Sequence, residues 1–364
     1  MADISLPTSS ADYTSLSSTY NDFAAPVFKI SCSGQSYTPD TLSLRQLTVH
    51  TTVEPMAEYA SFQIKEAFDP QTKEFIVPDG MTLGGTIDIE LGYGTELKAV
   101  FTGYITSLGY EAHEDEAAYV TIGCMDMTVL MMKTYGEKVW QKKKYSDVAR
   151  EIASSYAGSL TVDATSETIE NIAQYRQDDY HFLQELAFRS NRELLVVGKS
   201  VYFRKVAAST TPYLKLGWGA GLISLRLEHN IASQWSGIKV QSWDPLNREL
   251  LSSSTPTVVK IGDGTKTGSA LIGALGTYEA YHDLDGETVQ DVQNAADSLM
   301  QARSMDLVSG SGECVGIPEL RAGVYVAFTG LGTPVGRTCY LTGAVHVLDE
   351  QGYMIQFEVK GNAI

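Results

Sequence analysis

Alternation of apolar and polar residues, the pattern of half-buried β-strands, recurs along this chain. Ile87, Ile89 and Leu91 alternate with polar neighbours and are followed by a turn at Gly92-Tyr93-Gly94. Further short β-rich runs, separated by turn residues, lie at residues 27–32, 43–52, 61–64, 100–107 and 119–124. Short strands in close succession predict an antiparallel meander, which a short apolar helix at 127–132 closes.

A second meander near the C-terminus has the same order of parts. In both meanders a glycine opens a strand, a Gly-x-Gly turn follows, the next strand reaches Thr-Gly, and a third strand comes after a charged loop. The matched positions are Gly85 with Gly323, Gly92 and Gly94 with Gly330 and Gly332, and Thr102-Gly103 with Thr342-Gly343. Any two meanders share a strand pattern, but these matches favour an internal repeat. We therefore predict two related small antiparallel β-barrels in one chain.

Apolar residues spaced for a helix predict two amphipathic helices between the meanders. Ser146 is the expected N-cap of the first helix and Gly158 its end, and Asp178 or Asp179 caps the second. The apolar stripes are Val148, Ile152 and Tyr156 in the first helix, and Phe182, Leu183, Leu186 and Ala187 in the second. A β-hairpin at 192–205 and, farther on, a longer helix at about 287–305 complete the α+β material.

These elements predict a mainly β fold with α+β insertions. The expected parts are a flexible N-terminal arm (1–25), a first β-barrel (26–135), an α+β insert of two helices and a hairpin (136–205), connecting strands and the longer helix (206–305), and the strands of a second β-barrel (306–364). The arm is rich in Ser and Thr, so we expect it to order only on a partner. No long Pro, Gly or Ser-rich linker separates the parts, which predicts one interlocked body.

The chain has 364 residues and a formal net charge of -17, with 43% hydrophobic residues. Binding to nucleic acid depends on Lys and Arg at phosphates, so this charge argues against direct nucleic-acid binding. No apolar run has the length of a signal peptide core or a membrane span, and no membrane anchor is expected. The four cysteines, Cys32, Cys124, Cys314 and Cys339, lack any metal or redox spacing and are expected to be reduced core residues, which indicates assembly in the cytoplasm.

Motifs that carry catalysis or bind cofactors and metals are not found. The six histidines occur singly, and neither HExxH nor GxSxG is present. Three motifs fit turns or loops better than sites. GWGAG at 217–221 fits tight turns better than a phosphate loop, and YHDLDGET at 281–288 fits a capped turn better than a calcium loop. HEDE at 113–116 fits a hairpin loop better than a catalytic carboxylate pair. We expect no catalytic residues, no cofactor and no metal, and therefore no enzyme.

The segment YRQDDYHFLQELAFRSNRELLVVGKSVYFRK resembles a stretch of phage late control protein D and VgrG-type baseplate hubs, in which a tyrosine-arginine-glutamate motif precedes a phenylalanine-leucine helix and a hairpin. The matching residues are Tyr175, Arg176, Asp179, Phe182 and Leu183. Gln177, Asp178 and His181 depart from the pattern; Asp178 can still cap the helix, whereas His181 cannot return a carboxylate. FTGYITSL with CMDMTVL, VQSWDP, LRAGVYVAF and YLTGAVHVLDEQGYMIQFEV also resemble the family, so the resemblance spans most of the chain from about Val27.

The resemblance implies a structural hub of a contractile phage tail or tail-like injection system. Such hubs are trimers whose two related barrels alternate around a ring, so that three chains adapt a six-fold tail tube to a three-fold spike. The implied partners are two further copies of the chain, the tail tube protein, a separate spike protein, other baseplate proteins and, as a further candidate, the tape measure protein. Assembly is expected in the bacterial cytoplasm, and the product is a virion tail or injection particle.

The chain stops just after the second barrel, where VgrG proteins continue into a needle, so we expect the version with a separate spike. An acidic lumen would repel nucleic acid or acidic cargo, although solubility alone also explains the charge. Two other functions stay open at this point, a tail-associated peptidoglycan hydrolase and a receptor- or carbohydrate-binding tail-tip module.

Overall fold

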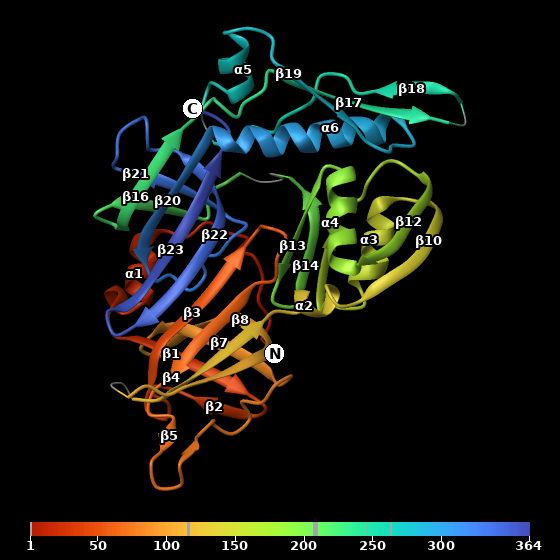
Figure 1. Cartoon of the computed structure of the whole chain (residues 1–364). Helices are drawn as coiled ribbons and strands as arrows, with labels where there is room; N and C mark the ends of the chain where they lie inside the picture. The colour runs from red at the N-terminus through yellow and green to blue at the C-terminus, as the bar shows by residue number, and fades with distance from the viewer. Residues whose placement is uncertain (1, 115–116, 207–209, 246, 263) are drawn as a thin grey trace.

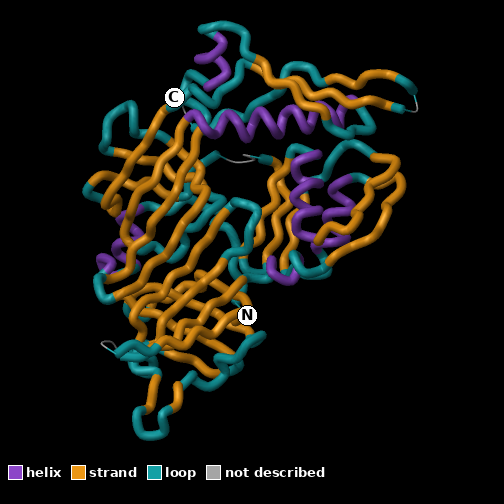
Figure 2. The backbone as a smooth tube through the Cα atoms, in the orientation of Figure 1, coloured by secondary structure: helices purple, strands orange, loops and turns teal. Residues whose placement is uncertain are grey.

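The computed structural model describes residues 2–114, 117–206, 210–245, 247–262 and 264–364. Figure 1 shows four parts: a first β-unit at the bottom, a second at the upper left, an α+β insert at the right, and a long helix across the top. Strands dominate both β-units, as the tube in Figure 2 shows. The predicted mainly β fold with α+β insertions is confirmed.

The first unit is a curved sheet with the strand order β2-β1-β7-β8-β9-β4-β3. Its strands are β1 Pro26–Cys32, β2 Gln35–Tyr37, β3 Leu44–Thr52, β4 Tyr59–Ile64, β7 Thr86–Tyr93, β8 Glu96–Glu111 and β9 Tyr119–Met125. All neighbours in this order are antiparallel. A small hairpin of β5 Phe68–Asp69 and β6 Glu74–Phe75 projects from it. Apolar residues at alternate positions, such as Ile87, Ile89 and Leu91, point into the core and are fully buried, as the sequence pattern predicts.

The second unit is a closed barrel of six strands, because β22 pairs with both β21 and β23. Its strands are β15 Leu214–Trp218, β16 Gly221–His229, β20 Val308–Val315, β21 Tyr325–Thr329, β22 Thr338–Asp349 and β23 Gly352–Gly361. β15 runs parallel to both β16 and β21, and the other neighbours are antiparallel. The sequence predicted this barrel from residues 306–364 alone. In the structure the strands β15 and β16, expected in the connecting segment, complete it.

One continuous sheet of thirteen strands joins the two units. β3, the last strand of the first unit, pairs antiparallel with the outer half of β22, from Gly343 opposite Thr52 to Asp349 opposite Gln46. The seam between β3 and β22 crosses the middle of the molecule, where the orange β3 and the blue β22 of Figure 1 lie side by side. One apolar core runs through both units, from Ile30 and Leu47 in the first to Val326 and Ile355 in the second. The two units are therefore one body.

The insert has its own apolar core. It contains α2 Thr128–Met131, β10 Tyr135–Lys143, α3 Tyr145–Ala153, β11 Ser159–Val162, β12 Ile169–Asp178, α4 Asp179–Arg189, β13 Arg192–Val197 and β14 Ser200–Lys205. The predicted helices and hairpin are present, and Asp178 is the N-cap of α4, accepting the N–H of His181 at 3.0 Å. The predicted N-cap of α3 is wrong: Lys144 holds that position, and Ser146 is buried and bonds Thr165.

A third layer covers the top of the insert and the second unit. It consists of the strands β17 Gly237–Asp244, β18 Glu249–Ser252 and β19 Glu279–Asp283, the helices α5 Gly268–Gly273 and α6 Val289–Ser304, and the 3-10 turn η2 Met305–Leu307. Ile238 and Val240 of β17 pack on Val292 and Ala296 of α6. The alternating pattern of β17 and the 3.6-residue spacing of α6 place these residues on the facing sides.

The N-terminal segment differs from the flexible arm expected from its composition. It forms α1 Tyr13–Thr19 and a 3-10 turn, η1 Asn21–Phe23, and it packs into the common core. Ile4 and Leu6 are 6% exposed and Tyr20 is fully buried, with its hydroxyl donating to Glu319 at 2.6 Å. A few apolar side chains thus anchor a segment that is rich in Ser and Thr.

Candidate assembly surface at the seam

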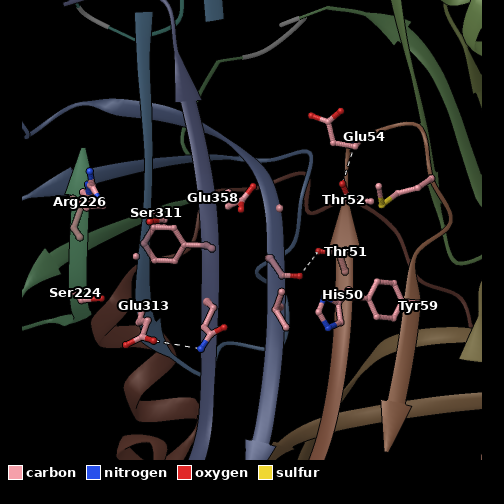
Figure 3. A pocket seen from close by; sticks show the side chains of 18 residues that line it. His50, Thr51, Thr52, Glu54, Tyr59, Ser224, Arg226, Ser311, Glu313 and Glu358 are labelled. Atoms are coloured by element: carbon pink, nitrogen blue, oxygen red, sulfur yellow. Dashed lines mark hydrogen bonds between the residues drawn. The ribbon is translucent and has the colours of Figure 1, made fainter. Parts of the chain in front are cut away.

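A groove of about 820 Å³ lies across the seam on the outer face of the common sheet. Its wall is formed by outward-facing side chains of six strands. From right to left in Figure 3 these strands are β4, β3, β22, β23, β20 and β16. The labelled residues are His50, Thr51, Thr52, Glu54, Tyr59, Ser224, Arg226, Ser311, Glu313 and Glu358. Because residues from both units line it, the groove exists only where the units are joined.

Small side chains make the floor of the groove concave. Ser224 lies on β16, Ser311 and Gly312 lie on the neighbouring β20, and Gly343 lies on β22, beyond β23. A Cβ atom at Gly312 would stand 2.3 Å from the carbonyl oxygen of Ser224 and 2.7 Å from the ring of Phe357. Glycine is therefore required for the close approach of β20 to β16.

Carboxylates outnumber cations along the groove. Three carboxylates, those of Glu54, Glu313 and Glu358, and one cation, Arg226, line it, and none of these four forms an ion pair with another described residue. The His50 ring stacks on Tyr59 at 4.0 Å between centroids, and burial lowers the pKa of His50, so this imidazole adds no positive charge at neutral pH. The groove is acidic, and its lining also includes exposed apolar and aromatic side chains such as Met56 and Tyr59.

A buried ionic cluster lies where the two units meet. One guanidinium nitrogen of Arg321 donates to both carboxylate oxygens of Glu58, at 2.8 and 2.6 Å. Asp126 lies close to this pair and accepts from the backbone N–H and the hydroxyl of Thr128. Burial raises the pKa of Glu58 against the opposing effect of Arg321, and burial followed by the charge of Glu58 raises the pKa of Asp126 well above its usual range. This cluster positions the units and is closed to solvent.

The family-motif residues of the insert have structural roles. Tyr175 is 68% exposed with the Arg176 guanidinium 5.1 Å from its ring centroid, where β12 bulges against β10. Asp179 accepts from the hydroxyl of Tyr156 and from the amide of Gln174 at 2.6 and 2.8 Å.

Two further motif residues lie in the core of the insert. Phe182 stacks on Trp140, and Leu183 is fully buried. In place of the acid of a capping box, the His181 ring nitrogen Nδ1 lies 2.8 Å from the Asp178 carboxylate.

The backbone aligns the two units differently from the Thr-Gly match. Ile105 exchanges hydrogen bonds with the Gly84-Gly85 pair, and Leu341 exchanges the same two with Gly323-Val324. Each strand then has a β-bulge one residue later, at Thr106 in β8 and at Thr342 in β22. Thr342-Gly343 is therefore equivalent to Thr106-Ser107, four residues beyond Thr102-Gly103.

The predicted Thr-Gly residues do not form one site: Thr342 and Gly343 are on β22 at the seam, whereas Thr102 and Gly103 are on β8, which β9 and β4 separate from β3. The Thr102 hydroxyl donates to Asp88 at 2.6 Å, and Gly103 lets β8 approach β9, because a Cβ there would stand 2.2 Å from the Met125 carbonyl oxygen. Gly343 lines the groove, while the carbonyl of Thr342 accepts from Val53. No local pattern in the sequence marks Glu58 and Arg321, which are distant along the chain, whereas Asp126 is the aspartate of the CMDMTVL stretch that resembles the family.

The structure offers no ready chemistry elsewhere among its described residues. They contain no group of three or more His, Cys, Asp or Glu side chains placed to hold a metal ion. The four cysteines are buried free thiols, as predicted. Of the HEDE loop, Asp115 and Glu116 lie outside the described residues. No helix formed by the described residues is long and apolar enough to cross a membrane.

Residues 24–350 match the family described as the Alg8 N-terminal domain. The chain belongs to this family. Its description names a domain and states no activity. No curated protein sequence matches the chain at a significant level.

Solved structures with the same fold include tail proteins. The 43 kDa tail protein of prophage MuSo2 from Shewanella oneidensis has a TM-score of 0.70 at 15% identity, over 92% of this chain and 98% of that one. The tail protein from Neisseria meningitidis MC58 has a TM-score of 0.68 at 11% identity, over 92% and 96%. An E. coli component of the type VI secretion system, itself structurally similar to bacteriophage T4 tail proteins, has a TM-score of 0.56 at 11% identity, over 92% and 77%. The chain therefore has a tail-protein fold along nearly its whole length.

Proposed function

We propose that this chain is the structural hub of the baseplate of a contractile phage tail or related tail-like injection system, of the late control protein D and VgrG type. In this role three chains form a ring that binds a six-fold tail tube on one side and a three-fold spike on the other. Further partners are the other baseplate proteins and the tape measure protein. The particle is assembled in the bacterial cytoplasm and the chain acts as part of it.

The observation that carries the proposal is the tandem of two related β-units joined side by side in one sheet. A ring of three chains then presents six similar units, which a six-fold tube can match, while the insert and the α6 layer occur once per chain and keep three-fold symmetry. The likeness to tail proteins over 92% of the chain supports the same role.

The proposal assigns the acidic groove to the inner wall of the ring. A concave sheet face whose carboxylates form no ion pairs repels acidic cargo such as nucleic acid. The chain then acts through its shape and charge, and we propose that it has no catalytic activity. Incubation with purified peptidoglycan is expected to give no turnover.

Light scattering over a dilution series tests the ring directly. A trimer of this 39.6 kDa chain has a mass of about 119 kDa, three times that of the subunit. We expect this mass for the chain alone, or, where the spike protein is needed for trimerisation, this mass plus that of the bound spike. A chain that stays monomeric under both conditions, or particles that assemble tubes tipped with spikes without it, would overturn the proposal.

A further inference from the structure

The contact between the two units joins unlike strands. The aligned backbone hydrogen bonds relate the order β7-β8-β9-β4-β3 of the first unit to the order β21-β22-β23-β20-β16 of the second. β3 thus corresponds to β16, and β8 corresponds to β22. At the seam, the last strand of one unit, β3, pairs with the outer half of the strand that carries the bulge in the other, β22. Such a head-to-tail contact can be repeated.

The two strands that would repeat this contact have free edges. On one edge of β8, the pairing with β7 ends where Thr86 lies opposite Tyr104. No described strand pairs with this edge at residues 106–111, whereas the other edge of β8 pairs with β9. β15 pairs with β16 only as far as Leu222, so the same holds for that edge of β16 at residues 223–229. Each open segment corresponds to one that is paired in the seam. A long open edge is a template for another strand.

Side chains on the open strands are more exposed than the corresponding side chains at the seam. Leu47 and Val49 of β3 are fully buried beside β22, whereas the corresponding Leu225 and Leu227 of β16 are only half-buried. Likewise His346 of β22 is 1% exposed, while the corresponding Tyr110 of β8 is 50% exposed. Apolar side chains on the core face of both open strands are therefore uncovered where their counterparts are covered.

We infer that β16 of one chain pairs antiparallel with β8 of a second copy, in the register of the β3–β22 seam. That register places Tyr110 of one copy opposite Leu227 of the other on the core face. On the groove face it places Glu111 opposite Arg226, which forms no ion pair with any described residue of its own chain. Aromatic–aliphatic and opposite-charge pairs across neighbouring strands each contribute about 0.2–1 kcal/mol. Steric fit and charge therefore agree with the same register.

This pairing rests on the proposed ring and specifies how it closes. Each chain offers one β16 edge and one β8 edge, so every copy binds two neighbours by the same contact, and a ring forms when the rotation closes. The groove, which ends at Ser224 and Arg226 on β16, then continues onto β8 of the next copy. Units related by the repeat alternate around the ring with the same strand contact at every junction.

Charge reversal tests the register. Arg226→Glu places two carboxylates opposite each other, and Glu111→Arg places two guanidinium groups opposite each other, so each single variant is expected to raise the dissociation concentration of the trimer about tenfold or more. The double variant R226E/E111R restores the attraction and is expected to associate like the unaltered chain. Arg248→Glu, in the exposed turn between β17 and β18, is the matched control and leaves association unchanged.

Cross-linking separates this inference from the proposed function. Gly109→Cys with Glu228→Cys sets two thiols opposite each other across the contact, and mild oxidation is expected to give covalent dimers and trimers, because the four native cysteines are buried. Each single-cysteine variant is the control and gives none. A trimer by light scattering that neither cross-links nor responds to charge reversal refutes the strand pairing while the ring stands. A chain that never associates refutes both.

Discussion

The Glu58–Arg321 pair tests how the two units are held together. Both side chains are almost fully buried, at 5% and 4% exposure, and the pair joins the residue just before β4 of the first unit to the segment before β21 of the second. Arg321→Met keeps the length of the stem and removes the charge. Breaking a buried ion pair by removing one partner costs about 3–5 kcal/mol. We expect a loss of that size in the free energy of unfolding at pH 7.5.

The pH dependence gives this prediction its sign. Burial already raises the pKa of Glu58, and Arg321 opposes that rise, so its removal raises the pKa further. Such a carboxyl group has a higher pKa in the folded than in the unfolded state, where it is about 4.3. Its contribution to stability is therefore complete below the unfolded pKa and is lost as pH rises through the folded pKa. The difference between Arg321→Met and the unaltered chain is therefore small at about pH 4.5 and grows towards pH 8. Asp126 beside it acts in the same direction.

Urea unfolding followed by near-ultraviolet circular dichroism, at three pH values, measures the difference. The double variant Glu58→Gln with Arg321→Met leaves no uncompensated charge on this pair and is expected to recover most of the loss. Arg303→Met, on the exposed side of α6, controls for the substitution itself. A loss below about 1 kcal/mol for Arg321→Met, or an equal loss at all three pH values, would refute the reasoning.

Two further predictions concern the buried His346 and the N-terminal segment. Burial lowers the pKa of His346 to about 3, so the neutral imidazole contributes stability that is complete above pH 6.5 and is lost as pH falls towards 3. His346→Gln is therefore expected to flatten the fall in the free energy of unfolding between pH 6.5 and 3, measured by urea unfolding. His282→Gln, at an exposed site, is the control and is expected to leave this fall unchanged. Tyr20 is fully buried between the first and second units, and its hydroxyl donates to Glu319. Measured by urea unfolding, Tyr20→Ala is expected to lower the free energy of unfolding by about 3–5 kcal/mol, and Tyr20→Phe by about 1 kcal/mol. A Tyr20→Ala variant as stable as the unaltered chain would mean that the N-terminal segment is held loosely.

The sequence predicted elements whose pattern is local. The helices α3, α4 and α6 follow from apolar spacing, and the hairpin β13–β14 follows from two apolar runs around Gly198-Lys199. The cap of α4 at Asp178 follows from capping chemistry. In each case the residues that decide the structure are neighbours along the chain.

Features that depend on distant residues could not be read from the sequence. The Thr-Gly pairs were matched four residues out of register, because a shift of an even number along a strand keeps the same face buried and leaves the alternating pattern unchanged. The N-terminal segment was expected to be flexible because composition does not show that Ile4, Leu6 and Tyr20 find a core. Glu58 and Arg321 carry no local signal, since what makes each of them important is the other.

The seam also has a consequence for synthesis of the chain. β3 leaves the ribosome early, but its partner strand β22 is synthesised much later, because Thr52 pairs with Gly343. At typical translation rates of about 5–20 residues per second, that wait lasts roughly 15–60 s. Throughout it, β3 is a bare edge that can pair with any other nascent chain. Chains whose synthesis stops before β22 keep that edge, and their removal by chaperones and proteases protects the supply of subunits competent for assembly.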